Sequence, residues 1–265
     1  MPLNKQTTYS IVVPLFNERE NVHHLIDEVF RVAEKMPERV ELVLVDDGSS
    51  DETFQMAADR AAADSRIVVV QHEHNRGLGA AIRTGIKRST GERVLYTDAD
   101  LPFDFDLIPG LFARSGDDKV LSGFRLNRGE GAKRLILTKG YNFGIRMIFG
   151  LKMNDVNFAC KVFPRRFVDE AVLQSEGSFI DVEMLLEVKR LGLRIVEEPL
   201  VYLPRERGVS TLSRPAVVFG IVKELASHLS LAFRHSREMR RSGRIAGTGF
   251  GSPQFDLVNG QKIDN

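Results

Sequence analysis

The sequence predicts an α/β fold in which an open, doubly wound, mostly parallel β-sheet is flanked by helices. Short runs of β-branched and other apolar residues alternate with segments of helical periodicity. The runs are apolar at successive positions, as expected for parallel strands that are covered on both faces. A length of 265 residues suits one such domain with a tail.

The elements are expected in a regular order as far as residue 123. Strands are predicted at 10–14, 40–46, 66–70, 93–97 and 119–123, and helices at 18–36, 51–63, 78–88 and 105–115. Beyond these, the pattern predicts a helix-like segment at 133–149, a strand at 157–163, a helix at 178–192 and a short pair of strands at 193–203.

Composition narrows the classes of function. Lys and Arg total 37 against 36 Asp and Glu, a net charge of +1, so no nucleic-acid partner is expected. Cys160 is the single cysteine, and its apolar neighbours indicate a packed thiol in a reducing compartment. The start of the chain has no apolar leader, and no run reaches the ~18 apolar residues of a membrane span. We therefore expect a cytoplasmic protein.

Polar residues collect where the predicted strands end, which is where doubly wound sheets bind ligands. Asn17 with Glu20, and Ser49 with Glu52, have the spacing of helix caps and need no further function. The adjacent Asp46 and Asp47 exceed what capping requires. On an extended strand end their side chains point to opposite sides, so one is expected to accept backbone donors while the other faces a ligand.

The stretch HNRGLGAAIRTG at 74–85 places glycines before a predicted helix. Free N–H groups at a helix start can cradle a phosphate, although close helix packing explains Gly77 and Gly79 almost as well. His72 and His74 flank Glu73 on a strand, a pattern open to metal binding, but we expect surface histidines.

Asp98-Ala99-Asp100 is the sharpest indication of a site. Residues i and i+2 of an extended segment project to one side, so the two carboxylates are expected to converge. At a separation of about 4 Å and an effective dielectric constant near 20, the two carboxylates repel each other by ~4 kcal/mol. A divalent cation bound between them turns this repulsion into a net attraction. Carboxylate oxygens select hard ions, so Mg²⁺ or Mn²⁺ is the predicted cofactor. The alternative is that both aspartates are simply solvated.

Basic residues gather in two later segments. These contain Arg125, Arg128, Lys133, Arg134 and Lys139, and then Arg205 and Arg207. Charge runs are usually solvated faces, but groups that converge on the Asp98–Asp100 pair would clamp phosphates, arginine through its bidentate fork.

With these residues in view, the chain resembles the family-2 inverting glycosyltransferases, specifically the polyprenyl-phosphate, dolichol-phosphate mannosyltransferase-like sugar transferases. The resemblance runs from about residue 9 to 214 and rests on motifs in the family's order: PLFNE at 14–18, DDGSSDET at 46–53, NRGLG at 75–79, Asp98-Ala99-Asp100, LSGFR, TKGYNFGIRMIFG, NDVNFACKVF and RERGVSTL. It implies a glycosyltransferase-A-type fold with a Rossmann-like, mostly parallel sheet.

The resemblance also implies roles for single residues. Asp98 and Asp100 would hold the metal on the donor diphosphate and, with Arg125 and Arg205, form the catalytic set. The implied phosphate and acceptor contacts are Arg125, Lys139, Arg205 and Ser210. The implied nucleotide contacts are Pro14, Phe16, Glu18, Val45, Asp46, Asp47 and Asp98.

Three positions depart from the family pattern. Pro102 stands where the family has a metal-side Gln, so coordination would be completed by water, the Ala99 carbonyl or the substrate. Lys139 stands for the usual Arg. Thr211 stands for the usual Lys, which removes a cation from the expected contact with the lipid phosphate.

The resulting hypothesis is a metal-dependent, inverting transfer of a hexosyl group from GDP-mannose or a UDP-sugar to a polyprenyl phosphate. One alternative is transfer to a hydroxyl acceptor, which needs a general base; Asp155, Asp181 and Glu183 are the candidates. A second is a catalytically silent nucleotide-sugar-binding module. The chain has no Trp and hence lacks the Q-x-x-R-W motif of processive polysaccharide synthases.

We expect a catalytic domain over 1–214, an amphipathic helix over 215–235 and a disordered basic, Gly- and Ser-rich tail over 236–265. The apolar stripe of this helix packs on the domain or, with the arginines that follow it, attaches the protein peripherally to the inner face of the plasma membrane. The stripe comprises Val218, Val222, Leu225, Leu229 and Phe233, and the arginines are Arg234, Arg237, Arg240, Arg241 and Arg244.

Overall fold

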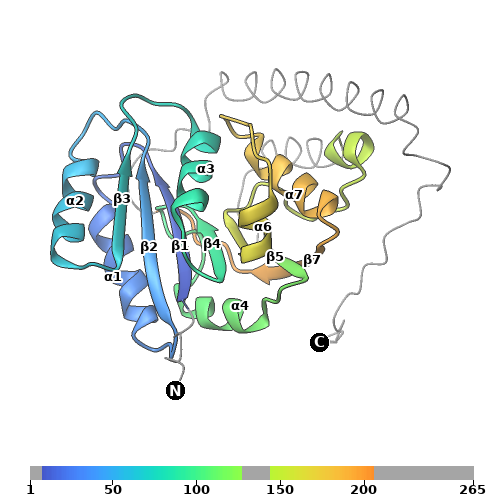
Figure 1. The fold of residues 1–265 in the computed structure, drawn as a ribbon, viewed down its shortest axis with the longest axis horizontal. Helices are drawn as coiled ribbons and strands as arrows, with labels where there is room; N and C mark the ends of the chain where they lie inside the picture. Colours follow the sequence, from blue (N-terminus) through green and yellow to red (C-terminus); the bar gives the residue numbers. More distant parts are fainter. Residues whose placement is uncertain (1–7, 127–143, 206–265) are drawn as a thin grey trace. The chain divides into compact units, whose positions relative to one another are not determined.

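The computed structural model describes residues 8–126 and 144–205, and a 7-stranded sheet is its centre. The strand order is β3-β2-β1-β4-β6-β5-β7 (Figure 1). β6 is antiparallel to β4 and β5, and the remaining pairings are parallel. The predicted mostly parallel sheet is therefore confirmed. The strands are β1 (Thr8–Leu15), β2 (Arg39–Asp46), β3 (Ile67–Gln71), β4 (Arg93–Thr97), β5 (Lys119–Arg125), β6 (Cys160–Pro164) and β7 (Arg194–Leu200).

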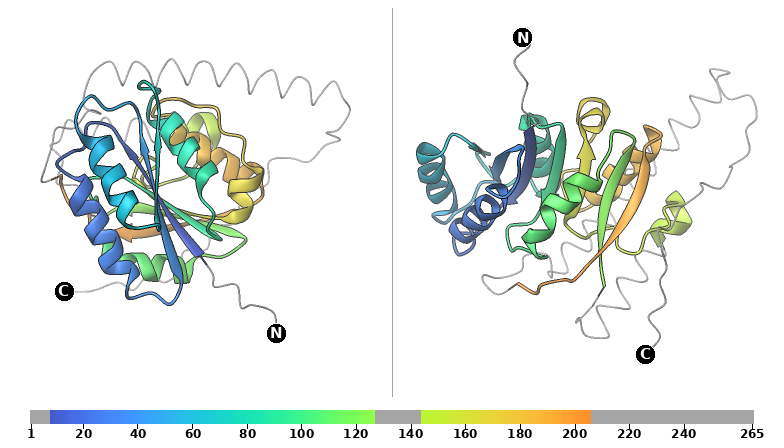
Figure 2. Two further views of the ribbon diagram at one scale, coloured as in Figure 1. Left: turned by 60° about the vertical axis from the view of Figure 1, so that its left-hand side comes forward. Right: turned by 90° about the horizontal axis from the view of Figure 1, so that it is seen from below.

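Helices cover both faces of the sheet (Figures 1 and 2). Alternate residues of β1 pack on opposite faces of the sheet. Ile11 and Val13 pack with residues of α1, α2 and α4, whereas Val12 packs with residues on the α3 face. Farther along the sheet, α6 and α7 lie on the α3 side. The helices are α1 (Val22–Ala33), α2 (Thr53–Ala63), α3 (Leu78–Arg88), α4 (Ile108–Arg114), α6 (Arg165–Glu170) and α7 (Ile180–Arg190), with the 3-10 turn η1 (Phe105–Leu107) before α4.

The strand order places a switch point beside β1. The chain builds β2 and β3 on one side of β1 and then returns to place β4 on the other side. In an open α/β sheet, ligands bind in the crevice outside the carboxyl ends of the strands at such a point. The segments that follow β1 and β4, which begin at Phe16 and Asp98, meet that requirement.

Several expected elements differ from the structure. The pair of strands expected at 193–203 is one strand, β7, which pairs with β5 along its whole length. The strand expected at 157–163 begins only at Cys160. Residues 144–149 are helical, but the rest of the 133–149 segment and the expected 215–235 helix lie outside the described residues. Within the described ranges, no helix combines the length and the apolar character needed to cross a bilayer.

The two predicted helix caps are wrong. The N-cap position of α1 is Asn21, not Asn17, and that of α2 is Glu52, whose carboxylate pairs with Arg19 instead of reaching back to Ser49. Loop-to-loop hydrogen bonds compete for the same polar groups, and here those bonds prevail.

Candidate active site

The loops after β1 and β2 are joined by hydrogen bonds. The Asn17 N–H donates to Ser49 Oγ at 2.9 Å, and the Ser50 N–H donates to Asn17 Oδ1 at 2.8 Å. The Glu18 N–H donates to Thr53 Oγ1 at 2.8 Å. Asn17 has a φ of 55°, a left-handed conformation that Asn tolerates better than most residues. The residues predicted as helix caps therefore fix the shape of one side of the switch point.

The two adjacent aspartates are both buried, and each accepts at least one hydrogen bond from a backbone N–H group. Asp47 is 3% exposed, and its carboxylate accepts from His72 Nδ1 at 2.7 Å, the Arg76 N–H at 3.0 Å and the Gly77 N–H at 2.8 Å. Asp46 accepts from the Ser49 N–H through Oδ2, while its buried Oδ1 has no hydrogen-bond partner within the described ranges.

The resemblance implied that both Asp46 and Asp47 contact the nucleoside. Asp47 accepts three hydrogen bonds within the protein, whereas Asp46 accepts one and keeps a buried Oδ1 that has no partner among the described residues. The Val45 side chain is fully buried in the cluster that includes Ala81 of α3. The contact expected at Val45 is therefore restricted to its backbone atoms. Pro14, Phe16 and Glu18 are partly buried at the end of β1 and just after it.

His72 is a buried residue, so the expectation of a surface histidine is wrong at this position. The residue is 7% exposed, and its Nε2 lies 2.9 Å from Thr84 Oγ1 of α3. Val68 and Val70 pack against the cluster beneath α3, and His72 continues the same alternation. That alternation was the signal in the sequence that could have revealed it. His74 is exposed as expected.

The start of α3 does not offer a free phosphate cradle. The Gly79 N–H donates to the Glu176 carbonyl at 2.8 Å, and the Gly77 N–H is held by Asp47. A Cβ at Gly77 would lie 2.3 Å from the Glu176 carbonyl oxygen, and one at Gly79 would lie 2.3 Å from that of Ser175. Close packing, the alternative reading, explains both glycines.

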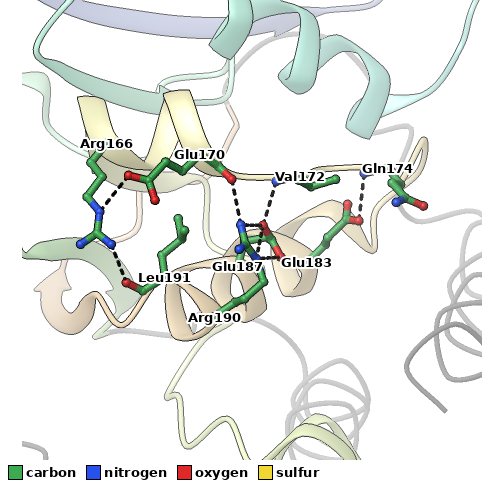
Figure 3. Close-up of polar contacts among 8 residues, drawn as sticks. All are labelled: Arg166, Glu170, Val172, Gln174, Glu183, Glu187, Arg190 and Leu191. Carbon is green, nitrogen blue, oxygen red and sulfur yellow. Dashed lines mark hydrogen bonds and ion pairs between the residues drawn. The ribbon is translucent and has the colours of Figure 1, made fainter. Parts of the chain in front are cut away.

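The loop that packs on α3 is in turn held by carboxylates of α7 (Figure 3). Glu183 accepts from the Gln174 and Ser175 N–H groups at 2.9 and 2.8 Å, and Glu187 accepts from the Val172 N–H at 2.8 Å. Glu183, one of the candidate general bases, is therefore an anchor for this loop.

Asp98 and Asp100 lie in a turn that follows β4. The prediction that they lie on an extended segment is therefore wrong. Leu101, the next residue, has a φ of 51°. Even so, the charge of Asp100 acts on the pKa of Asp98. Burial raises the pKa of Asp98 to about 7, and the negative charges of Asp100 and Asp181 add to the effect. The Tyr96 hydroxyl donates to Asp98 Oδ1 at 3.2 Å.

This pair fits a hard cation that takes its other ligands from outside the chain. Asp100 Oδ1 is buried and has no hydrogen-bond partner among the residues described. The side-chain atoms of this pair that would bind a metal are all carboxylate oxygens, the ligands that Mg²⁺ and Mn²⁺ prefer. In the described ranges, no group of three or more His, Cys, Asp or Glu side chains is placed to hold an ion. Pro102 adds no side-chain ligand, and its carbonyl accepts from the Leu203 N–H at 2.9 Å.

Arg205 joins the two sides of the switch point. Its Nε donates to Asp100 Oδ2 at 2.9 Å, and its Nη2 donates to Glu18 Oε1 at 2.6 Å. The side chains of Arg205, Glu18 and Asp100 are 20%, 13% and 19% exposed, so these ion pairs are shielded from bulk water. The guanidinium supplies positive charge where the cation site and the β1 loop meet.

Two further ion pairs are buried. Arg125 binds Asp155 with both ends of its fork, at 2.6 and 3.2 Å. Lys161, which is 0% exposed, binds Asp181 at 2.6 Å and the Phe158 carbonyl at 2.9 Å. Burial raises the pKa of Asp181, and Lys161 opposes that shift. The other two candidate bases are thus also held by partners.

The remaining candidates lie outside the described residues. They are Lys139 and Ser210 from the implied phosphate contacts, with Arg128, Lys133, Arg134, Arg207 and Thr211 from the basic segments and the departures.

A mostly parallel sheet whose switch point carries acidic oxygens and an arginine is the arrangement expected of a glycosyltransferase of the GT-A fold. Residues 10–171 match the family described as glycosyl transferase family 2, and the chain belongs to that family.

Among curated proteins, the chain is similar to an undecaprenyl-phosphate 4-deoxy-4-formamido-L-arabinose transferase of Pseudomonas syringae. The two are 36% identical over 174 residues, which is 64% of this chain and 51% of the relative. The chain thus spans about half the length of that relative.

Among solved structures, the fold is similar to that of glucosyl-3-phosphoglycerate synthase from Mycobacterium tuberculosis. The complex with phosphoglyceric acid has a TM-score of 0.64 and 23% identity, over 84% of this chain and 80% of that one. The complex with Mn²⁺, UDP and glucosyl-3-phosphoglycerate has a TM-score of 0.62 and 22% identity over the same shares, 84% and 80%. At this identity the likeness establishes the GT-A fold alone.

Proposed function

We propose that this chain catalyses the metal-dependent, inverting transfer of a hexosyl group from a nucleotide-diphosphate sugar, GDP-mannose or a UDP-sugar, to a polyprenyl phosphate. Membership of family 2 supports the reaction class. The relative's name, which couples undecaprenyl phosphate with a sugar, supports the acceptor class. That sugar is an arabinose derivative, so the donor panel below includes pentoses as well as hexoses.

One observation carries the choice of acceptor: each of the three candidate bases named from the sequence is already engaged by a partner in the described part of the chain. Asp155 pairs with Arg125, Asp181 pairs with Lys161, and Glu183 accepts two backbone N–H groups. A hydroxyl acceptor needs a base within hydrogen-bond reach to remove its proton. An ionised phosphate oxygen carries no proton and needs no base, which fits this site.

The donor side follows from the second acidic pair. Asp98 and Asp100 would hold a divalent cation, which when bound offsets the negative charge that develops on the leaving diphosphate. Arg205 spans Asp100 and Glu18, and its fork suits a phosphate as well as a carboxylate. Asp46 offers its remaining oxygen to an N–H of the nucleobase.

The test compares two acceptors that differ only in the phosphate. Purified protein with Mn²⁺ is given a panel of GDP- and UDP-linked hexoses and pentoses with a short polyprenyl phosphate or with the matching free polyprenol, and the glycosylated lipid is measured. We expect product from the phosphate alone. Product from the free alcohol would contradict the proposal. Absence of both product and nucleotide release with every donor would indicate a catalytically silent binding module.

A variant experiment tests the same point from the protein side. Glu183→Gln is expected to transfer to the phosphate acceptor at a rate within about fivefold of the parent protein, because no proton has to be removed. A Glu183→Gln protein that is folded by circular dichroism yet inactive at every pH would favour a hydroxyl acceptor.

We further propose that the 1–214 catalytic domain meets its lipid through reversible membrane binding by the helix predicted from the sequence over 215–235 and the arginines up to Arg244. This rests on the sequence, in which an apolar stripe precedes the basic cluster. Near an anionic leaflet each such charge contributes roughly 1 kcal/mol at moderate salt. Liposome flotation of the full chain and of a chain that ends at Phe233 tests it. Flotation of the full chain on anionic vesicles, reduced by salt and by truncation, is expected; equal behaviour of the two chains would refute it.

A further inference from the structure

The buried contact among Asp47, His72 and Thr84 lies outside the groups assigned above to donor and acceptor. It joins the end of β2, the residue after β3 and the second turn of α3. The side chains of His72 and Asp47 are 6% and 4% exposed. A buried imidazole with both ring nitrogens bonded is held in one orientation.

The direction of these bonds follows from the carboxylate. An ionised carboxylate can only accept, so His72 Nδ1 carries the proton and donates to Asp47. The other ring nitrogen, Nε2, shares a hydrogen bond with the Thr84 hydroxyl at 2.9 Å. Asp47 also accepts from the Arg76 and Gly77 N–H groups. The three side chains therefore tie the 74–77 loop to the body of α3.

The 74–77 loop packs directly against Gly48 in the loop of residues 46–49, here called the aspartate loop. A Cβ at Gly48, which has a φ of 69°, would lie 2.5 Å from the carbonyl carbon of His74 and 2.7 Å from the Asn75 nitrogen. The two backbones are thus in direct contact. Asp46 lies two residues before Gly48, and the Asp47 N–H donates to the Leu15 carbonyl of β1 at 2.8 Å. A shift of the 74–77 loop would move the aspartate loop with it.

From this arrangement we propose that His72 and Thr84 are positioning residues for the nucleotide. Through Asp47 they fix the aspartate loop, and with it the position of Asp46, which the proposed function assigns to the nucleotide. Neither residue touches the reacting atoms. The inference deepens the proposed function and rests on its assignment of Asp46 to the nucleotide. Loss of the contact should weaken nucleotide binding and leave the chemical step of a saturated enzyme nearly unchanged.

Three substitutions separate the two halves of the contact. His72→Asn places an amide N–H where Nδ1 stands and keeps the donor to Asp47. His72→Leu removes both bonds. Thr84→Val keeps the shape of the threonine and removes the hydroxyl. His74→Leu, at an exposed histidine two residues farther on, is the matched control.

The measurements are the Kd of UDP and of GDP with Mn²⁺, by calorimetry, and the KM and kcat for whichever donor is active. We expect His72→Leu to weaken binding of the preferred nucleotide at least tenfold and to raise the donor KM similarly, with kcat changed by less than about threefold. His72→Asn should recover most of the affinity, Thr84→Val should fall between them, and His74→Leu should match the parent protein.

The outcomes distinguish this inference from the proposed function. If the parent protein binds neither UDP nor GDP, the proposed function fails. If it binds one of them and the His72 variants bind equally well, only the positioning role is overturned. A fall in kcat with unchanged KM would also overturn it. Should His72→Leu not fold, the KM-to-kcat comparison of His72→Asn and Thr84→Val decides the matter.

Discussion

The two sides of the switch point hold their acidic residues in different ways. After β2, Asp46 and Asp47 accept mainly from backbone N–H groups, and Glu18 in the loop after β1 is the acidic residue on this side that pairs with Arg205. On the other side, Asp98 and Asp100 follow β4 and repel each other, and Arg205, which follows β7, pairs with Asp100. A carboxylate held by backbone donors keeps its place whether or not a ligand is present, whereas one held by a mobile cation can exchange that cation for another.

This difference suggests that the two sides of the donor site bind different parts of the donor. The side with backbone donors is preformed and suits recognition of a base, which requires fixed geometry. The side with charges is built to exchange partners and suits the binding of a metal and a diphosphate. The experiments below change one side at a time.

The largest effect is expected in the buried pair behind the charged side. Lys161→Met would leave Asp181 buried without its cation, and breaking such a pair typically costs about 3–5 kcal/mol of unfolding free energy. The double variant Lys161→Met/Asp181→Leu should lose much less, because no buried charge remains. Urea denaturation of the parent, both single variants and the double variant measures the coupling. Equal losses for Lys161→Met and the double variant would contradict this account.

The next largest effect is on turnover. Asp98→Asn or Asp100→Asn is expected to lower turnover by at least ~10²-fold with the fold intact, because charge stabilisation by a metal contributes several kcal/mol. Glu73→Gln, at an exposed carboxylate, is the control and should be unaffected. Rates with Mn²⁺ and with chelator are compared. Full activity of either Asp variant in chelator would remove the metal from the proposal.

The sequence predicted the layers of the fold well because parallel strands buried on both faces leave continuous apolar runs. Strands β1 and β2 were placed to within two residues at each end. The starts of α1 and α4 were predicted less well, because the helices expected from residues 18 and 105 begin at Val22 and Ile108. Asn17 and Ser49 have the composition of caps, but each bonds to the other loop, and such a contact between residues 32 apart in the chain leaves no local pattern.

The candidate site shows the same limit. Spacing alone indicated that Asp98 and Asp100 act together, although the turn that joins them was expected to be extended. Spacing could not reveal which of Asp46 and Asp47 faces the protein, since that depends on the Arg76 and Gly77 N–H groups from another loop. The partners of Asp155 and Asp181 are likewise set by the sheet order, because Arg125 and Lys161 lie on neighbouring strands.

Arg205 provides a test of partner exchange on the charged side. In Arg205→Ala the cation on Asp100 is lost, so the negative charge available to a metal increases by one unit. We expect Mn²⁺ alone, measured by its paramagnetic resonance signal, to bind about five- to tenfold more tightly, with Arg205→Lys in between. Arg114→Ala, which breaks the more exposed pair with Glu198, should bind like the parent. Weaker Mn²⁺ binding by Arg205→Ala would mean that the guanidinium supports the metal site and does not compete with it.

The smallest effect is expected on the side with backbone donors, at Asn17. Asn17→Gly keeps the left-handed backbone conformation at φ 55° and removes the bonds from Ser50, so the loss isolates uncharged hydrogen bonds. An ordinary hydrogen bond contributes about 1 kcal/mol net, and we expect a loss of that order in unfolding free energy. Because neither partner is charged, the loss should be the same in low and high salt. Arg19→Gln, which breaks the exposed ion pair with Glu52 on the same two loops, should have little effect, and any effect should vanish in high salt. A strongly salt-dependent loss for Asn17→Gly would show that charge also shapes this side, and the contrast between the two sides would fail.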